Sequence, residues 1–153
     1  MIIATAAATI TELGPLSRIV AQFCELIESR ATGKSVTAAD WAPLEELVDV
    51  KKFKRVGAYL EELNWNEYVK FLTQWAGGTR FETTVHRISE VGHAVFYEIE
   101  ERHYRGDEFI RKNVIAVYHF DEHNKIRHLD IYEQAKDTGR WIVDAANAAT
   151  AAP

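Results

Sequence analysis

Four successive strand-like runs, separated only by short turn signals, occupy the stretch from about Phe81 to Gln134. They are Phe81–Ser89, Val91–Arg105, Glu108–Asp121 and Lys125–Gln134. The residues between them favour tight turns, as in Arg105-Gly106-Asp107. A parallel crossover needs a dozen or more connecting residues, so runs joined this closely must be antiparallel neighbours. This feature predicts an antiparallel meander that serves as the scaffold of the fold.

Three segments before the meander have the apolar spacing of helices. They run from Leu16 to about Thr32, from Thr37 to about Asp49, and from Asn64 to about Ala76. Asn64, with Glu67 three residues later, predicts a capping box at the third helix. A short extended piece lies before it. Helices grouped ahead of an antiparallel sheet are typical of the α+β class. We therefore predict three N-terminal helices packed on a curved antiparallel sheet of four to six strands, with a cone-shaped pocket between the layers.

The chain of 153 residues is long enough for one domain with a proper core. We expect a flexible arm over residues 1–14, a single domain over 15–143, and a flexible alanine-rich tail over 144–153. The net charge of −5 argues against a nucleic-acid partner, which would favour a basic face. No apolar run approaches the length of a membrane span, and the N-terminus lacks the basic region of a signal peptide. Cys24 is the only cysteine, which fits a cytoplasmic location.

Strand alternation divides Val91–Arg105 into two faces, one carrying Tyr97, Ile99 and Glu101, and the other Glu98 and Glu100. Neither face is purely apolar, so the pattern does not decide which one lines the pocket. If Glu98 and Glu100 enter it, desolvation and mutual repulsion would raise at least one pKa toward neutrality, as general acid–base chemistry requires. The alternative is a solvated or dimer-facing side on which Arg102 pairs with these glutamates.

The last strand places a histidine, an acid and a phenol on one face: His128, Asp130 and Tyr132. A His and an Asp two apart can hydrogen-bond laterally, and a neighbouring Tyr can donate to an oxyanion. The alternative is a polar, solvent-facing row behind a core face formed by Leu129 and Ile131.

Further pocket candidates come from three other elements. Val114, Ala116 and Tyr118 form one side of the Glu108–Asp121 strand and suit either a pocket wall or plain core. The aromatic face of the third helix includes Trp65 and Tyr68, which also suit a core. Arg55 is the nearest cation to offset buried carboxylates, although a surface role fits as well. His103, His119, His128 and Glu101 lack metal-ligand spacing, so no metal site is predicted.

With these elements placed, the chain resembles the nuclear-transport-factor-2-like (NTF2-like) superfamily, which includes ketosteroid isomerases, scytalone dehydratase, SnoaL-like polyketide cyclases and limonene epoxide hydrolases. The resemblance covers about Pro15 to Gln134 and rests on element order and three local stretches. These are Glu82-Thr83 leading to Gly92, the run Asn113–Tyr118, and Ile126–Tyr132. It implies a hydrophobic ligand in the cone and a homodimer formed through the convex sheet face.

The limonene epoxide hydrolases have an Asp-Arg-Asp triad, with a Tyr and an Asn that hold the water. Counting from Gly92, Glu98 resembles the Arg position and Glu100 the first Asp, while the second Asp falls near Asp130 with a register uncertain by one. The Tyr and Asn positions resemble Phe53 and Arg55. The exchange of Arg for Glu argues against epoxide hydrolysis. Asp130 is also similar to the last-strand Asp of SnoaL-like cyclases.

The resulting hypothesis is a cofactor-independent, SnoaL-like enzyme. It would bind a hydrophobic polyketide-, terpenoid- or steroid-like molecule and carry out isomerisation, cyclisation, dehydration or hydration. The predicted catalytic residues are Asp130, Glu98 and Glu100. The predicted substrate-binding residues are Arg55, Tyr68, Trp65, Val114, Ala116, Tyr118, His128 and Tyr132. The alternative is a non-catalytic ligand-binding or dimerisation module of the same fold.

Overall fold

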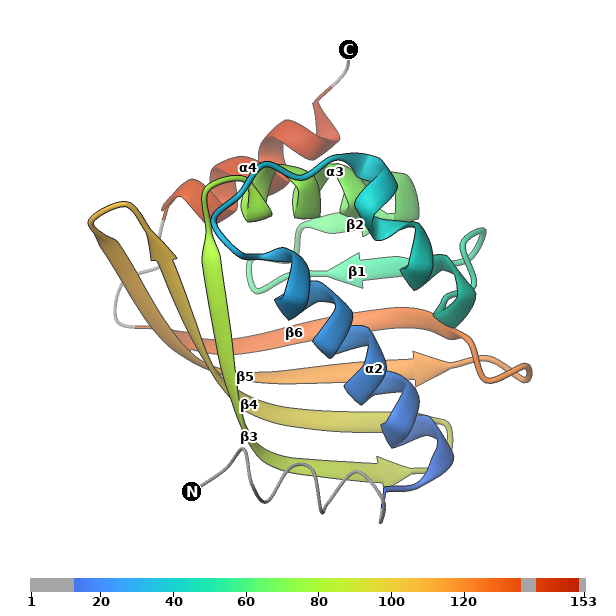
Figure 1. Ribbon diagram of the computed structural model, residues 1–153. Helices are drawn as coiled ribbons and strands as arrows, with labels where there is room; N and C mark the ends of the chain where they lie inside the picture. Colours follow the sequence, from blue (N-terminus) through green and yellow to red (C-terminus); the bar gives the residue numbers. More distant parts are fainter. Residues whose placement is uncertain (1–12, 136–139, 152–153) are drawn as a thin grey trace.

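The computed structural model has a curved six-stranded sheet with helices on its concave side (Figure 1). It describes residues 13–135 and 140–151. In chain order the elements are α2 (Pro15–Arg30), the 3₁₀ helix η1 (Ala38–Leu47), β1 (Lys54–Val56), β2 (Glu62–Asn64), α3 (Trp65–Ala76), β3 (Arg80–Val91), β4 (Ala94–Arg105), β5 (Glu108–Phe120), β6 (Ile126–Ala135) and α4 (Arg140–Thr150). The strand order is β2-β1-β6-β5-β4-β3. The α+β class is therefore confirmed, and none of the described helices is long and apolar enough to span a membrane.

The predicted meander is present as β3 to β6, each strand antiparallel to the next. The sheet as a whole is mixed, however, because β1 pairs with β6 in parallel, with Arg55 opposite Leu129. The expectation of a fully antiparallel sheet was therefore wrong. A helix and four strands separate β1 from β6 in the sequence, so no hairpin dictates their relative direction.

Helix α2 packs one apolar stripe on the sheet, formed by Leu16, Val20, Phe23 and Ile27. Its N-terminus is anchored by Glu90 at the end of β3. The Glu90 carboxylate accepts hydrogen bonds from the Leu16 backbone N–H at 2.9 Å and the Ser17 hydroxyl at 3.2 Å. A carboxylate at this position satisfies a free N–H group and complements the positive end of the helix dipole.

The second predicted helix is a 3₁₀ helix, η1, and not an α-helix. Pro43 lies inside it and lacks the N–H that an α-helical hydrogen bond would use. In a 3₁₀ helix residues three apart lie above one another. Trp41 and Leu44 therefore share one face, and each is only 1% exposed.

Helix α3 begins as predicted. The Asn64 side chain accepts from the Glu67 N–H at 3.0 Å, and the Asn64 N–H donates to the Glu67 carboxylate at 3.2 Å. This capping box fixes the start of the helix. The helix then buries Tyr68, Phe71 and Trp75 toward the concave face of the sheet.

The C-terminal region differs from the expected flexible tail over 144–153. Residues 140–150 form α4, which lies beside α3 (Figure 1). Ala145, Ala146 and Ala149 are buried in the core cluster, because small side chains let the helix approach its neighbours closely. The arm expected over residues 1–14 lies outside the described residues except for Leu13 and Gly14.

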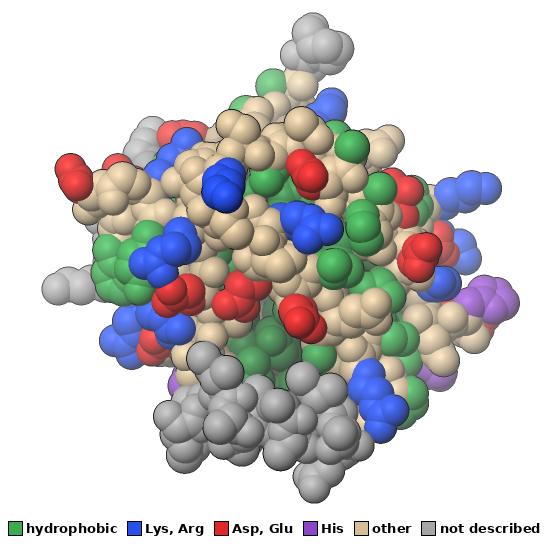
Figure 2. Space-filling view, in the orientation of Figure 1, with side chains coloured by type: hydrophobic (Ala, Val, Ile, Leu, Met, Phe, Trp, Pro, Cys, Tyr) green, Lys and Arg blue, Asp and Glu red, His purple; other side chains and the backbone are tan. Residues whose placement is uncertain are grey.

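Charged side chains of both signs are interspersed over the face seen in Figure 2, with apolar side chains visible between them. The described residues on this face therefore form a mixed surface and not a patch of one sign.

Candidate functional site

A cavity of about 100 Å³ lies between the concave face of the sheet and helices α2, α3 and α4. This volume is several times the roughly 10–15 Å³ that one water molecule requires. The apolar lining includes Ile27, Phe71, Leu72 and Ile99. The polar lining consists of Cys24, Arg55, Tyr68, Thr83, Tyr97, Glu101, His103, Lys112, Tyr118 and Glu133.

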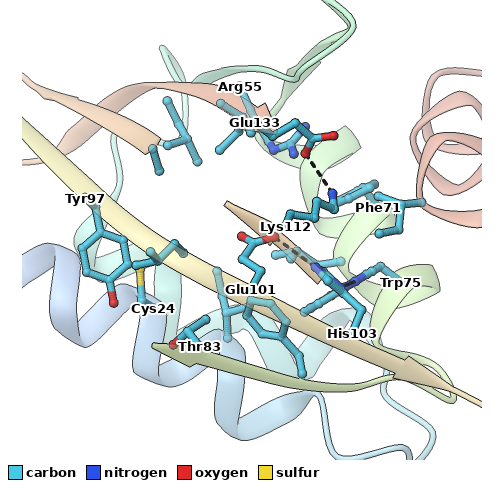
Figure 3. Close-up of a pocket in the computed structure, with 18 of the residues that line it drawn as sticks. Cys24, Arg55, Phe71, Trp75, Thr83, Tyr97, Glu101, His103, Lys112 and Glu133 are labelled. Atoms are coloured by element: carbon cyan, nitrogen blue, oxygen red, sulfur yellow. Dashed lines mark hydrogen bonds and ion pairs between the residues drawn. The ribbon is translucent and has the colours of Figure 1, made fainter. Parts of the chain in front are cut away.

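Glu101 and His103 follow each other along the concave face of β4 (Figure 3). His103 Nε2 lies 3.0 Å from Glu101 Oε2, and His103 Nδ1 lies 3.1 Å from Trp75 Nε1. An indole N–H can only donate, so His103 Nδ1 is the acceptor and the neutral ring carries its proton on Nε2. His103 therefore donates to the Glu101 carboxylate.

The His103 ring is held by aromatic neighbours and is only 4% exposed. Its centroid lies 4.8 Å from that of Phe81, 5.8 Å from Trp75 and 6.0 Å from Trp141. These contacts and the Trp75 hydrogen bond fix both the orientation and the tautomer of the imidazole.

Glu101 remains an ionised carboxylate although its side chain is only 18% exposed. Burial alone would raise the pKa of Glu101, but the hydrogen bond from His103 and the positive charges of Lys112 and Arg55 outweigh it and hold the pKa below its ordinary value. Lys112 lies directly opposite Glu101 in the β4–β5 register. An ionised carboxylate in a cavity can accept a proton from a bound molecule or from water.

A second charged pair lies on the same face. Lys112 Nζ donates to Glu133 Oε2 at 2.8 Å, and the two side chains are 5% and 10% exposed. The strands place them diagonally, because Glu133 lies opposite Val114, two residues beyond Lys112. Two glutamates and one lysine thus meet at one end of the cavity, where their charges partly compensate.

The other end of the cavity holds phenols and a thiol (Figure 3). Cys24 Sγ lies 3.2 Å from the Tyr118 hydroxyl. Burial raises the pKa of the Cys24 thiol to about 12, so this cysteine stays protonated and is no nucleophile. Burial also raises the pKa of Tyr68, Tyr97 and Tyr118 above the ordinary value, which keeps them neutral hydrogen-bond donors.

Four of the predicted substrate-binding residues line the cavity: Arg55, Tyr68, Ala116 and Tyr118. Val114 is buried on the same face but is not part of the lining. Trp65 is core, with its ring 5.2 Å from that of Phe53 and its indole N–H donating to Glu45.

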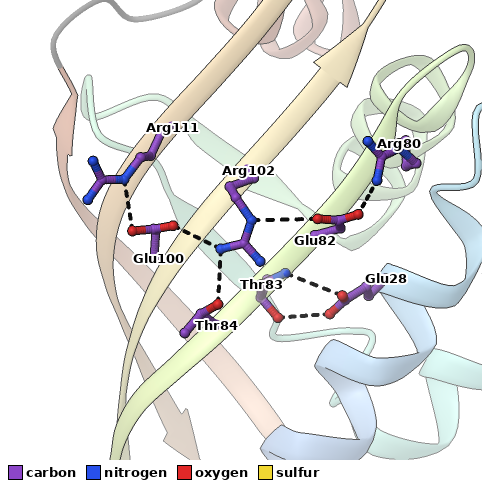
Figure 4. A network of polar contacts seen from close by, with 8 residues as sticks. All are labelled: Glu28, Arg80, Glu82, Thr83, Thr84, Glu100, Arg102 and Arg111. Carbon is purple, nitrogen blue, oxygen red and sulfur yellow. Dashed lines mark hydrogen bonds and ion pairs between the residues drawn. The ribbon is translucent and has the colours of Figure 1, made fainter. Parts of the chain in front are cut away.

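Glu98 and Glu100 do not enter the cavity, because the β4 register turns them to the convex face. Arg102 and Arg111 donate to the Glu100 carboxylate at 2.9 and 2.8 Å (Figure 4). These two hydrogen bonds hold the pKa of Glu100 below its ordinary value, the opposite of the shift expected for a buried acid pair. The Glu98 carboxylate is 44% exposed and lies 3.8 Å from Arg87.

Asp130, His128 and Tyr132 also lie on the convex face. Asp130 is hydrogen-bonded to His128 Nε2 at 2.8 Å, the lateral contact that their spacing predicts, and to His119 Nε2 at 3.2 Å. Tyr132 is 62% exposed. Glu101 and His103 are thus separated by the sheet from His119 and His128, and no group of three potential metal ligands occurs among the described residues.

The cavity residues missed at the sequence level include Trp75, Glu101, His103, Lys112 and Glu133. One signal could have found the four that lie on strands. Each strand is apolar along half of its concave face: Tyr97 and Ile99 precede Glu101, Ala116 and Tyr118 follow Lys112, and Leu129 and Ile131 precede Glu133. Because a strand keeps its faces along its length, the apolar half identifies the face and its polar continuation identifies the site. Trp75 had no such signal, since its contact with His103 joins two distant elements.

Three solved structures illustrate what the chain is similar to. An LEH-like epoxide hydrolase from M. tuberculosis matches with a TM-score of 0.56 and 18% identity over 82% of this chain and 94% of that chain. A candidate SnoaL-like polyketide cyclase from Jannaschia sp. CCS1 matches with a TM-score of 0.59 and 10% identity, over 92% of this chain and 98% of that chain. A steroid delta-isomerase from Pseudomonas aeruginosa matches with a TM-score of 0.57 and 16% identity, over 89% of this chain and 92% of that chain. Further matches are NTF2-like proteins of unknown function.

The chain has the NTF2-like fold. No protein-family model and no curated protein matches it, and likeness at these identities establishes the architecture alone. The NTF2-like fold hosts several chemistries, so the reaction must be argued from the cavity. The carboxylate of β4 that faces the cavity is that of Glu101, one residue beyond Glu100, the position that the count from Gly92 gave.

Proposed function

We propose that the chain is a small-molecule enzyme that binds a hydrophobic polyketide-, terpenoid- or steroid-like substrate in the cavity and uses Glu101 for acid–base chemistry. The observation that carries this proposal is the Trp75–His103–Glu101 chain of hydrogen bonds, which presents an ionised carboxylate to a largely apolar cavity. The reactions that suit it are isomerisation, cyclisation, dehydration and hydration.

Each group has a distinct part in this chemistry. Glu101 takes the proton from a substrate C–H or from water and later returns it. His103 is a positioning residue, because it holds the carboxylate from behind and donates to it. The phenols of Tyr97 and Tyr118 are neutral donors that can stabilise negative charge developing on a substrate oxygen. Glu98, Glu100 and Asp130 have no part in this scheme, because they lie across the sheet from the cavity.

The test is isotope incorporation. Cyclic enones, terpene epoxides and cyclic β-diketones are incubated with the protein in D₂O or H₂¹⁸O, and the products are followed by mass spectrometry. For a compound that is labelled or turned over, we expect Glu101→Gln to lower the rate by about 10²- to 10⁴-fold.

Glu98→Gln is the matched control, since it makes the same change three residues earlier on the opposite face. It should leave the rate unchanged. Full activity of Glu101→Gln, or loss of activity in Asp130→Asn, would contradict the assignment of Glu101. If the wild-type protein labels none of the compounds, the result favours the non-catalytic alternative.

The second candidate function is a ligand-binding or dimerisation module. It is favoured by three exposed apolar side chains on the convex face: Phe96 is 42%, Ile115 is 40% and Tyr132 is 62% exposed. Ile115 and Tyr132 are direct cross-strand partners. We infer a homodimer through this face, and light scattering coupled to size exclusion tests it: a mass near twice that of the chain is expected, and a monomer at high concentration contradicts it.

A further inference from the structure

Arg55 is the one residue of the short strand β1 that lines the cavity. Its partner in the register, Leu129, also faces the cavity, so the sheet directs both side chains to the same side. The guanidinium carbon lies 5.0 Å from the ring centre of Phe71 and 5.6 Å from that of Tyr68. The side chain is only 11% exposed. Two aromatic faces therefore hold a desolvated cation at the cavity wall.

The hydrogen-bonding capacity of this guanidinium is incomplete. Arg55 Nη1 is buried and has no hydrogen-bond partner among the described residues. The nearest carboxylate, that of Glu61, lies 3.6 Å from Nη1, which makes an ion pair without a hydrogen bond. A buried donor left unpaired is costly, so an acceptor in the cavity toward which the guanidinium turns on binding would remove this cost.

We propose that Arg55 determines the class of ligand: the molecule that fills the cavity carries an uncharged acceptor oxygen, such as a ketone carbonyl, that accepts a hydrogen bond from Arg55 Nη1. This inference rests on the cavity being the binding site, as in the proposed function, and adds which functional group the ligand must present and where.

Charge balance favours a neutral oxygen over a carboxylate. The two cations of the cavity, Arg55 and Lys112, are already matched by Glu101 and Glu133, and Glu61 adds a further negative charge beside Arg55. His103 is neutral in the tautomer that Trp75 imposes. A ligand carboxylate would bring another anion into this desolvated site, whereas a carbonyl supplies the missing acceptor without changing the charge.

The experiment compares three probes of similar shape: 1-tetralone, tetralin and 1,2,3,4-tetrahydro-2-naphthoic acid, which carry a carbonyl, no oxygen and a carboxylate. Dissociation constants are measured by NMR titration of wild-type protein, Arg55→Met and Lys54→Met. Met keeps most of the length and apolar contact of the Arg side chain. Lys54→Met is the matched control, because it removes a cation from the neighbouring position of β1, where the lysine side chain is 49% exposed.

Wild-type protein and Lys54→Met should bind 1-tetralone at least about tenfold more tightly than tetralin, and Arg55→Met should lose this preference. The proposal is overturned if tetralin binds as tightly as the ketone, if Arg55→Met keeps the preference, if the acid binds best, or if folded wild-type protein binds none of the probes. Because binding is measured and not turnover, inactivity of the enzyme or full activity of Glu101→Gln would count against the proposed chemistry alone.

A second measurement covers the case in which Arg55→Met does not fold. The Nε–H signal of Arg55 in the wild-type protein is assigned through contacts with the ring protons of Phe71 and Tyr68. It should shift on addition of 1-tetralone and stay unchanged with tetralin. An unmoved signal at saturating ketone would overturn the proposal on its own.

Discussion

Removing one partner of the Lys112–Glu133 ion pair should destabilise the protein strongly, whereas removing both should not. Lys112 Nζ and Glu133 Oε2 lie 2.8 Å apart, and the two side chains are 5% and 10% exposed. Removing either partner therefore leaves a desolvated charge. Breaking a buried pair typically costs about 3–5 kcal/mol. We expect about 3 kcal/mol for Lys112→Met, the lower end of that range, because the pair borders a cavity that water can enter.

The double variant Lys112→Met/Glu133→Leu should differ from wild type by less than about 1 kcal/mol. Replacing a buried pair by apolar side chains of similar size is often neutral or stabilising, because neither charge has to be desolvated. The free energy of unfolding is measured by urea titration of the wild type, both single variants and the double variant. The resulting double-mutant cycle should give a coupling energy of at least about 2 kcal/mol.

Lys54 and Glu62 provide the matched control cycle. They are also a Lys–Glu pair on neighbouring strands, 3.3 Å apart, but their side chains are 49% and 61% exposed. Exposed pairs contribute about 0–1 kcal/mol, so the same substitutions should show almost no coupling. If the Lys112–Glu133 cycle is additive within about 0.5 kcal/mol, the argument from burial is refuted.

Two further outcomes follow from the site and from α4. Lys112→Met should also raise the pKa of Glu101, because it removes a positive charge that lowers it. In any reaction that uses ionised Glu101, the acid limb of the pH–rate profile should move to higher pH, and an unmoved limb would contradict the electrostatic role of Lys112. The pKa of Glu101 is lower in the folded protein than in the unfolded chain, so ionised Glu101 stabilises the fold at any pH above its pKa in the unfolded chain. This contribution should be lost as the pH falls through the pKa of Glu101 in the folded protein, which urea titrations at several pH values would show. Ala146 is 3% exposed, so Ala146→Asp should lower the unfolding free energy by about 3 kcal/mol. Substituting Asp for the exposed neighbour Asn147 should have little effect. Equal effects of the two variants in thermal or urea unfolding would show that α4 does not pack as described.

Local signals predicted most of the scaffold. Turn residues between closely spaced runs required the antiparallel meander, and Asn64 with Glu67 marked the start of α3 because a capping box acts within one helical turn. Elements that depend on distant partners were predicted less well. The parallel pairing of β1 with β6 and the packing of α4 arise from contacts between residues far apart in the sequence, for which local pattern gives no signal.

The predicted catalytic acids Glu98, Glu100 and Asp130 lie on the opposite face of the sheet from the cavity. The alternating pattern of β4 has charges on both sides, and the likeness to limonene epoxide hydrolases, counted from Gly92, selected Glu98 and Glu100 over Glu101. In a strand, a shift of one residue moves every side chain to the opposite face. When the strand is predicted but the face that lines the pocket is not, two alternative sets of candidate residues result.

The sequence by itself determined the α+β class, the meander, the capped helix and the presence of carboxylates on the central strands, because these depend on spacing, turn chemistry and composition. Only the tertiary structure decided which carboxylates line the cavity. That choice depends on which face the helices cover and on contacts such as Trp75 with His103, which bring together groups 28 residues apart. The same packing stacks Arg55 on two aromatic rings and leaves Nη1 without an acceptor. Helix packing thus desolvates one face of the sheet, and this desolvation gives the charges on that face their chemical roles.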